Sequence, residues 1–468
     1  MRKISYLLSL LSLVMFLLAL TNCKEIKGFS KKPNPTEEGN LPTIRPSRMS
    51  ISSPEGGYKE IVVSGDSATL QLIADSLGIQ NIKRCSCDDD IMLWNIPDTL
   101  NIENAIGTVR RNSHSGVKGD VNIEIVLPSR SKEVQLIKQD EIRATINPNN
   151  GESVIVIIDT GLEIQTLIDE GNFKLLQTDK YNNAICGDSI TSINGSYGWN
   201  FINKNTDLSD FTQHGTLVTK NILKNVPNSD KEQFQILPLK VFNNHGKGNY
   251  WEIVCAFSYI NKIIEMEEAV GNKIDIAIVN ASFGATLAET SFNFSEDFLV
   301  LKDYIDLLNE KSIVVASAGN ERRNNDTLPH FPSSYNSSLS FNTASMQPSN
   351  NIVSVAGYEK DNYGSLLLAT TEIATVGSNY GIKSVDLAAP WSYILESKIQ
   401  TQGIVDAVKF QVEGTSYGAG YLSAKLLKFG LEHPNLRGHS LLHSFLYESN
   451  IVKRPNNGLP VIDFKYIE

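Results

Sequence analysis

The feature that most constrains the fold is a series of short, nearly continuous apolar runs after Gly151. Each run has the length of a β-strand: Val154–Ile158, Ile274–Val279, Ile313–Ala316 and Ile352–Ala356. Strands without alternating polar positions are buried on both faces. Segments with helical spacing separate the runs, for example Ile253, Ala256, Phe257 and Ile260. This alternation predicts an α/β domain over residues 150–468, with a parallel sheet covered by helices on both faces and functional residues at the carboxyl ends of its strands.

Four short segments place a reactive or polar side chain at the end of such a run or at the start of an apparent helix. Asp159 ends an apolar run, and His214 precedes Gly215 at the start of a helical pattern. Asn320 follows a run of small residues, and Ser416 opens a second helical pattern. Each residue also has an ordinary alternative role. Asp159, Asn320 and Ser416 could be turn or cap residues, and His214 could simply be packed in the core.

Taken together and in this order, the four segments resemble the subtilisin-like serine peptidases, the subtilase family. The resemblance covers roughly residues 150–468. Four further motifs agree with it: Gly198–Phe201, Leu239–Phe242, Asn280–Gly284 and Val385–Pro390. It implies a subtilisin-like fold and a serine endopeptidase that acts on protein or peptide substrates.

The resemblance also implies a role for each residue. Ser416 would be the nucleophile, His214 the base and then the acid, and Asp159 the group that fixes the imidazole tautomer. The Asn320 amide and the Ser416 backbone N–H would stabilise the oxyanion. No cofactor and no metal ion is expected. Two segments would flank an extended substrate, through the residues Ser282, Phe283 and Gly284 and the residues Ala318 and Gly319.

The sequence departs from the family after the nucleophile. Where the family usually has Met-Ala, a small residue and Pro, this chain has Tyr417-Gly418-Ala419-Gly420. Two glycines are expected to loosen the first turn of the helix. An inactive or weakly active subtilase-fold binding lipoprotein therefore remains an alternative. A nucleotide-binding doubly wound domain is excluded because no Gly-rich phosphate loop follows any predicted strand.

The N-terminus resembles a bacterial lipoprotein signal. Arg2 and Lys3 precede an apolar stretch from Leu7 to Leu20, which is short for a membrane span. Cys23 follows it, as in a lipobox, although Asn22 stands where a small residue is usual. We predict a signal peptide over residues 1–23, a lipid anchor at Cys23 and an exported protein of the bacterial cell envelope. It would be an outer-membrane lipoprotein that faces the periplasm or the surface; ordinary secretion is the alternative.

Two further regions precede the α/β domain. Residues 24–54 are rich in Pro, Ser, Lys and Glu and predict a flexible linker. Residues 55–128 show the order strand, helix, strand, strand, helix, strand, which indicates a ferredoxin-like α+β domain or a generic α+β unit. Its last predicted strand is the alternating stretch from Val121 to Leu127.

The family resemblance implies that residues 55–128 are a prosegment, an intramolecular inhibitor that assists folding. Its connecting tail, residues 129–149, would pass through the substrate cleft, and self-cleavage would fall within about 128–150. The alternative is a permanent spacer that is never removed.

Charge and cysteine content exclude other classes. A net charge of -10 argues against a nucleic-acid partner, which needs a concentrated basic surface. Cys85 and Cys87 are too close in sequence for an ordinary disulfide, and no His or Cys cluster accompanies them as a metal site would require. With Cys186 and Cys255 they are predicted to be mostly structural thiols, without a disulfide framework.

Overall fold

The computed structural model describes residues 43–44, 50–52, 59–127, 152–167, 173–187, 195–286, 298–337, 347–360, 362, 366–370, 375–401, 404–448, 452–454 and 464–467. The predicted signal peptide with Cys23, most of the predicted linker and the predicted connecting tail lie outside these residues. Within them, no helix has the length and apolar character needed to cross a membrane.

Within the described residues, the main sheet contains eleven strands. Their order is β10-β11-β8-β13-β15-β17-β19-β23-β22, with β9 beside β11 and β18 beside β17. Strands β10 to β23 of this order run parallel, whereas β18 and β22 are antiparallel to their neighbours. The bounds are β8 Ser153–Asp159, β9 Lys174–Leu175, β10 Trp199–Asn200, β11 Phe234–Lys240, β13 Asp275–Ala281, β15 Ile313–Ser317, β17 Ile352–Lys360, β18 Leu366–Leu368, β19 Leu387–Pro390, β22 Val452–Arg454 and β23 Phe464–Tyr466.

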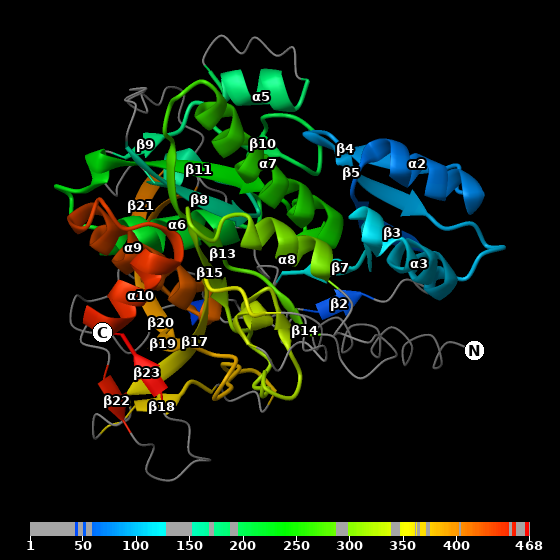
Figure 1. The fold of residues 1–468 in the computed structure, drawn as a ribbon. Coiled ribbons are helices and arrows are strands. Elements are labelled where there is room, and N and C mark those ends of the chain that lie inside the picture. The colour runs from blue at the N-terminus through cyan, green and yellow to red at the C-terminus, as the bar shows by residue number, and fades with distance from the viewer. Residues whose placement is uncertain are drawn as a thin grey trace, which may run out of the picture. The chain divides into compact units, whose positions relative to one another are not determined.

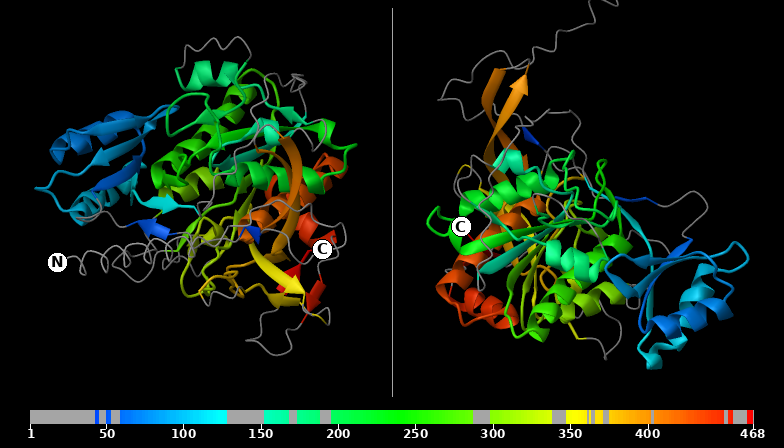
Figure 2. Two further views of the ribbon diagram at one scale, coloured as in Figure 1. Left: turned by 180° about the vertical axis from the view of Figure 1, so that it is seen from behind. Right: turned by 90° about the horizontal axis from the view of Figure 1, so that it is seen from above.

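Helices cover both faces of this sheet (Figures 1 and 2). In β8, Ile155 and Ile157 join one core cluster, while Val154, Val156 and Ile158 join the other. Since successive side chains of a strand point to opposite faces, both faces are buried and the strand is apolar throughout. The predicted α/β fold is confirmed. The helices are α6 (His214–Asn225), α9 (Thr415–Glu432) and α10 (Gly438–Glu448) on one face, and α7 (Tyr250–Ala269) and α8 (Leu299–Asp306) on the other.

The strand order reverses at β8. After β8 the chain forms α6 and then β11 on one side, and α7 then leads to β13 on the other side. In open α/β sheets, sites form outside the carboxyl ends of the strands at such a reversal. Asp159 is the last residue of β8, so the fold places this carboxylate at that point.

Residues 60–121 form a four-stranded antiparallel sheet with two helices. Together with the segment 122–127 that follows it, we call this region the N-terminal domain. Its strands lie in the order β4-β5-β3-β6. Side-chain oxygens of Asp66 and Asn101 accept backbone hydrogen bonds at the helix starts, as N-caps do. The order of elements is the one expected from the sequence: β3 Glu60–Ser64, α2 Ser67–Ser76, β4 Ile82–Cys85, β5 Asp88–Asn95, α3 Ile102–Arg111 and β6 Lys118–Val121.

The single strand predicted from Val121 to Leu127 is wrong. The chain leaves the domain sheet after β6, and β7 (Glu124–Val126) joins a separate three-stranded sheet. There β7 pairs antiparallel with β12 (Lys247–Asn249), at the start of α7, and with β2 (Ser50–Ser52). Alternation shows that one face is buried, but it does not show which strand is the partner.

The prediction that the cysteines form no disulfide framework is also wrong. Cys85 is bonded to Cys255 of α7, and Cys87 is bonded to Cys186 after α5 (Asp179–Ile185). The Cα–Cα distances are 5.9 and 4.0 Å. Cys85 and Cys87 are indeed not bonded to each other, but each has a partner far along the chain. Sequence spacing alone does not reveal such partners.

A long antiparallel hairpin, β20 (Ser392–Thr401) with β21 (Ile404–Glu413), extends away from the main sheet (Figure 2). It lies between Asn320 and Ser416 in the chain and so lengthens the separation of these two residues. The remaining elements are β1 Thr43–Ile44, η2 Ser113–Ser115, α4 Ile164–Leu167, η4 Lys231–Gln233, β14 Ala285–Thr286, β16 His330–Phe331 and η5 Ser333–Asn336.

Candidate active site

Asp159 and His214 form a buried hydrogen-bonded pair. The Nδ1 atom of His214 lies 2.8 Å from Oδ1 and 3.0 Å from Oδ2 of Asp159. A carboxylate can only accept, so Nδ1 carries a proton; in the neutral imidazole Nε2 then has the lone pair. The side chain of Asp159 is 1% exposed and that of His214 is 8% exposed. This is the arrangement of a base whose tautomer is fixed by a carboxylate.

Gly215 allows α6 to begin this close to β8. A Cβ atom on Gly215 would lie 2.4 Å from the carbonyl oxygen of Gly161 and 2.9 Å from the Cβ of Asp159. Any side chain here would therefore push the helix and His214 away from the carboxylate.

Asp210 is a second buried carboxylate that holds the start of α6. Its Oδ2 accepts from the N–H of Thr216 (2.9 Å) and from its hydroxyl (2.7 Å). Its Oδ1 accepts from the hydroxyl of Thr160 (2.8 Å), which in turn accepts from the N–H of Gly215 (2.9 Å). Asp210 thus links the end of β8 to the start of the helix. The sequence analysis missed it; an Asp four residues before the His was the available signal.

The charge of these carboxylates changes the protonation of His214. Burial alone would lower the pKa of the imidazole, but the charge and hydrogen bond of Asp159, together with the charge of Asp210, outweigh it and raise the pKa of His214. The imidazolium form is therefore stabilised relative to a free histidine.

Ser416 lies in the first turn of α9, with its side chain buried. Its hydroxyl donates to the carbonyl oxygen of Ser282 at 2.9 Å. Among the described residues, no hydrogen bond joins this hydroxyl to His214; the ring of the next residue, Tyr417, lies 5.9 Å from the His214 ring. Catalytic hydrogen bonds are often loose before substrate binds. In this structure the Ser416 hydroxyl is therefore bonded to Ser282 and not to His214.

The two glycines after Ser416 do not interrupt the helix, contrary to the expectation of a loosened turn. α9 is continuous from Thr415 to Glu432. A Cβ on Gly418 would lie 3.4 Å from Ala389, and one on Gly420 would lie 3.3 Å from the carbonyl oxygen of Val218 in α6. The glycines therefore allow α9 to pack closely on β19 and α6, which offsets their low helix propensity.

Asn320 is oriented by the residue before the serine. Its Oδ1 accepts from the N–H (3.0 Å) and the hydroxyl (2.9 Å) of Thr415. The same hydroxyl accepts from the N–H of Gly319 at 3.2 Å. Among the described residues no acceptor bonds Nδ2 of Asn320, so this N–H group is available to an anionic oxygen beside Ser416. Thr415 was not among the sequence-predicted site residues and is a positioning residue.

The two segments expected to flank substrate also lie beside the serine. Ser282 and Phe283 follow β13 and are buried, and Ala318 and Gly319 follow β15. The buried imidazole of His330 lies between the segments: a Cβ on Gly284 would lie 2.1 Å from its Cε1, and a Cβ on Gly319 would lie 2.8 Å from its Cδ2. Burial lowers the pKa of His330 to about 3, so the ring is neutral. Sequence reasoning missed His330.

A comparison with protein families identifies the family to which the chain belongs. The sequence model described as "Subtilase family" matches residues 150–455. The chain belongs to the subtilase family. All the segments that carry the pair, the serine and the amide lie within the matched range. No curated protein matches the chain.

Solved structures similar to this subtilase share little sequence with it. A cold adapted subtilisin-like serine proteinase is 15% identical, with 71% of this chain and 94% of that chain covered and a TM-score of 0.41. Fervidolysin from Fervidobacterium pennivorans, a keratinolytic enzyme related to subtilisin, is 14% identical over 91% and 63%, with a TM-score of 0.48. The A-subunit of the AB5 toxin from E. coli is 15% identical over 68% and 90%, with a TM-score of 0.42. The family assignment rests on the family match, since these values are low.

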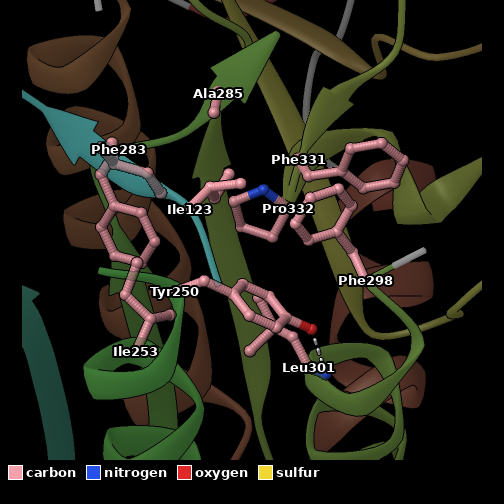
Figure 3. Close-up of a pocket in the computed structure, with 10 residues that line it drawn as sticks. Ile123, Tyr250, Ile253, Phe283, Ala285, Phe298, Leu301, Phe331 and Pro332 are labelled. Carbon is pink, nitrogen blue, oxygen red and sulfur yellow. Dashed lines mark hydrogen bonds between the residues drawn. The ribbon is translucent and has the colours of Figure 1, made fainter. Parts of the chain in front are cut away.

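An apolar pocket of the subtilase domain receives the strand from the N-terminal domain (Figure 3). Ile123 and Ile125 line it together with Tyr250, Ile253 and Phe283, the last of which was predicted to bind substrate. The N–H of Leu127 donates to the carbonyl oxygen of Gly246 at 2.7 Å, which continues the β7–β12 pairing. A segment of the chain's own N-terminal domain thus occupies a strand position next to the predicted substrate-binding residues.

Proposed function

We propose that this subtilase is a serine endopeptidase with Asp159, His214 and Ser416 as its triad and Asn320 as an oxyanion donor. The observation that carries the proposal is the buried Asp159–His214 pair at the carboxyl end of β8. The ring of Tyr417, the residue after Ser416, lies 5.9 Å from the His214 ring, and Thr415, the residue before Ser416, orients the Asn320 amide. Burying the Asp159 carboxylate is costly, and a role in proton transfer at His214 would account for that cost. The inactive subtilase-fold lipoprotein remains the alternative that experiment must exclude.

The chemistry follows from the geometry. When substrate binds, the Ser416 hydroxyl leaves the Ser282 carbonyl and gives its proton to Nε2 of His214 as its oxygen attacks the scissile carbonyl. Nδ2 of Asn320 and the N–H of Ser416, in the first turn of α9 where no helical carbonyl is available, donate to the oxyanion. His214 then gives the proton to the leaving amine, and a water molecule hydrolyses the acyl-enzyme by the same route in reverse.

The test compares two serines. Ser416→Ala should abolish cleavage of an unfolded protein substrate while thermal unfolding stays close to that of the wild type. Ser440→Ala, in α10 away from the site, should retain the activity. Equal residual cleavage by both variants would favour the binding-protein alternative or a different nucleophile.

We further propose that the N-terminal domain is a prosegment that assists folding and inhibits the active site. Its buried Asp120 accepts from the Tyr250 hydroxyl and from the N–H of Val300 at the start of α8, both at 2.8 Å. Its Asn122 accepts from the N–H of Trp251 at the start of α7 at 3.1 Å. The domain thus supplies helix caps to the subtilase domain. Large parallel sheets fold slowly because their contacts are non-local, so such pre-formed caps would assist folding.

Inhibition and self-cleavage are supported by where β7 lies. The strand β7, which lies beside β12, ends at Val126, so a cut within 128–150 would fall after this strand and before the subtilase domain. Residues 129–468 expressed alone should fold poorly, and added 55–128 should restore folding and inhibit the product. Efficient folding of 129–468 without inhibition by 55–128 would refute both roles.

For location, we propose export and a lipid anchor at Cys23 on the grounds of the N-terminal signal alone. Cys23→Ser should release the protein from membranes and abolish incorporation of labelled fatty acid, whereas Ser30→Ala should change neither. Unchanged membrane association and fatty-acid labelling in Cys23→Ser would refute the anchor.

A further inference from the structure

Both disulfides cross from the N-terminal domain to the subtilase domain. Cys85 ends β4 and Cys87 lies in the turn before β5. On the other side of the interface, Cys186 directly follows α5 and Cys255 belongs to α7. The bonds join residues separated by 170 and 99 positions. No disulfide among the described residues lies within either domain.

The order of these cysteines along the chain has a simple consequence. Cys85 and Cys87 precede residues 128–150, and Cys186 and Cys255 follow them. Any single cut within 128–150 therefore leaves two fragments that two covalent bonds still join.

Hydrogen bonds also join the two domains around the disulfides. Beside Cys255, the Ser258 hydroxyl of α7 donates to the buried Asp88 carboxylate of β5. Further along the same interface lie Asp120 and Asn122, which cap α8 and α7, and then the β7–β12 pairing. The N-terminal domain thus contacts α7 at its start and at its centre.

We propose that the N-terminal domain is a permanent, disulfide-linked subunit of the enzyme rather than a segment that is released. A linked domain rebinds as an intramolecular event, at an effective concentration in the millimolar range that dilution cannot lower. Cleavage of the connecting tail alone then yields a two-chain protein in which β7 still lies beside β12.

Two consequences rest on the proposed function. The Ile123 and Ile125 side chains would still form one wall of the apolar pocket after the cut, so cleavage would open only the part of the cleft nearest Ser416. The subtilase domain would also stay attached to any anchor at Cys23, because the fragment that carries Cys23 is the fragment that carries Cys85 and Cys87.

The test uses the full chain with Ser416→Ala and a recognition site for a foreign site-specific protease within residues 129–149. This design makes the result independent of peptidase activity, so failure of the proposed function would leave it unchanged. After oxidative folding, alkylation of free thiols and complete cutting, the protein should run as one species on a denaturing gel without reductant. With dithiothreitol it should run as two. Two species without reductant would overturn the proposal.

Cysteine variants show which cysteines form each disulfide. Cys85→Ser and Cys87→Ser should each leave one linked species, because the other disulfide remains, and the double variant should separate into two without reductant. If the double variant does not fold, peptide mapping of the unreduced wild type gives the answer. It should contain Cys85 linked to Cys255 and Cys87 linked to Cys186; a Cys85 to Cys87 link would overturn the proposal.

Discussion

We call the edge of the main sheet at Asp159 and His214 the catalytic edge, after its proposed function. This edge and the interface with the N-terminal domain both bury carboxylates, but they use them differently. At the catalytic edge, Asp159 faces the ionisable group His214 and raises its pKa. At the interface, Asp120 accepts from a tyrosine hydroxyl and a helix N–H, which have no such role in proton transfer. Loss of the first carboxylate should therefore change chemistry, and loss of the second should change stability.

The largest effect is expected for Asp159→Asn. The amide would stabilise the wrong imidazole tautomer, so kcat should fall by about 10⁴. Because Asp159 raises the pKa of His214, the residual activity should persist to lower pH than in the wild type. Profiles of kcat and of kcat/KM against pH measure the two effects. An acid limb that does not move, with kcat near the wild-type value, would remove Asp159 from the mechanism.

The next largest effect is expected for Asn320→Ala. Nδ2 would bond the oxyanion and not the ground state, so kcat should fall by about 10²–10³ with little change in KM. Steady-state kinetics on one peptide separates the two parameters; a change confined to KM would argue against the role.

Two substitutions of Thr415 test whether its hydroxyl positions the Asn320 amide. Thr415→Val removes the hydroxyl that holds Oδ1 of Asn320 and should lower kcat less than Asn320→Ala does, whereas Thr415→Ser keeps the hydroxyl and should restore kcat. If Val and Ser behave alike, the hydroxyl does not position the amide.

A smaller effect, on specificity, is expected for His330→Ala. The neutral ring lies between the two segments that would flank substrate, so the wild type should prefer small side chains before the scissile bond. Removing it should raise kcat/KM for an aromatic residue relative to alanine by roughly tenfold or more. A peptide series that differs at this one position measures the shift, and an unchanged preference would mean that the substrate side chain lies elsewhere.

The smallest effect on activity, but a clear effect on stability, is expected for Asp120→Ala. In the uncut Ser416→Ala chain, the free energy of unfolding should fall by about 1–3 kcal/mol, since two buried donors lose their acceptor. Asp98→Ala, which removes an exposed ion pair with Lys59, should change it much less, because water and salt screen such a pair. Denaturant unfolding of both variants measures this; equal losses would show that the interface does not depend on Asp120.

The catalytic edge was readable from sequence because each of its residues adjoins a local pattern. Asp159 ends an apolar run, Asn320 follows small residues, and His214 and Ser416 each open a helix. The structure brings these four segments together as the strand and helix order requires. Sequence did not reveal Asp210, Thr415 or His330, because their roles are set by distances to groups that no local pattern identifies.

The interface was the least readable region for the same reason. The alternation from Val121 to Leu127 indicates burial, but the partner β12 lies more than a hundred residues later in the chain. Cys85 and Cys87 have partners in two different helical regions, and spacing in sequence carries no information about either pairing. Long-range contacts of single residues require the fold.

The measurement that tests the central claim most directly is the site and rate of fluorophosphonate labelling, since this probe reacts with a serine only when a base activates it. Peptide mapping should find one adduct, on Ser416, and its rate of formation should rise with pH through a pKa above that of a free histidine. An adduct on another serine, or labelling of equal rate in Ser416→Ala, would contradict the assignment of the active site.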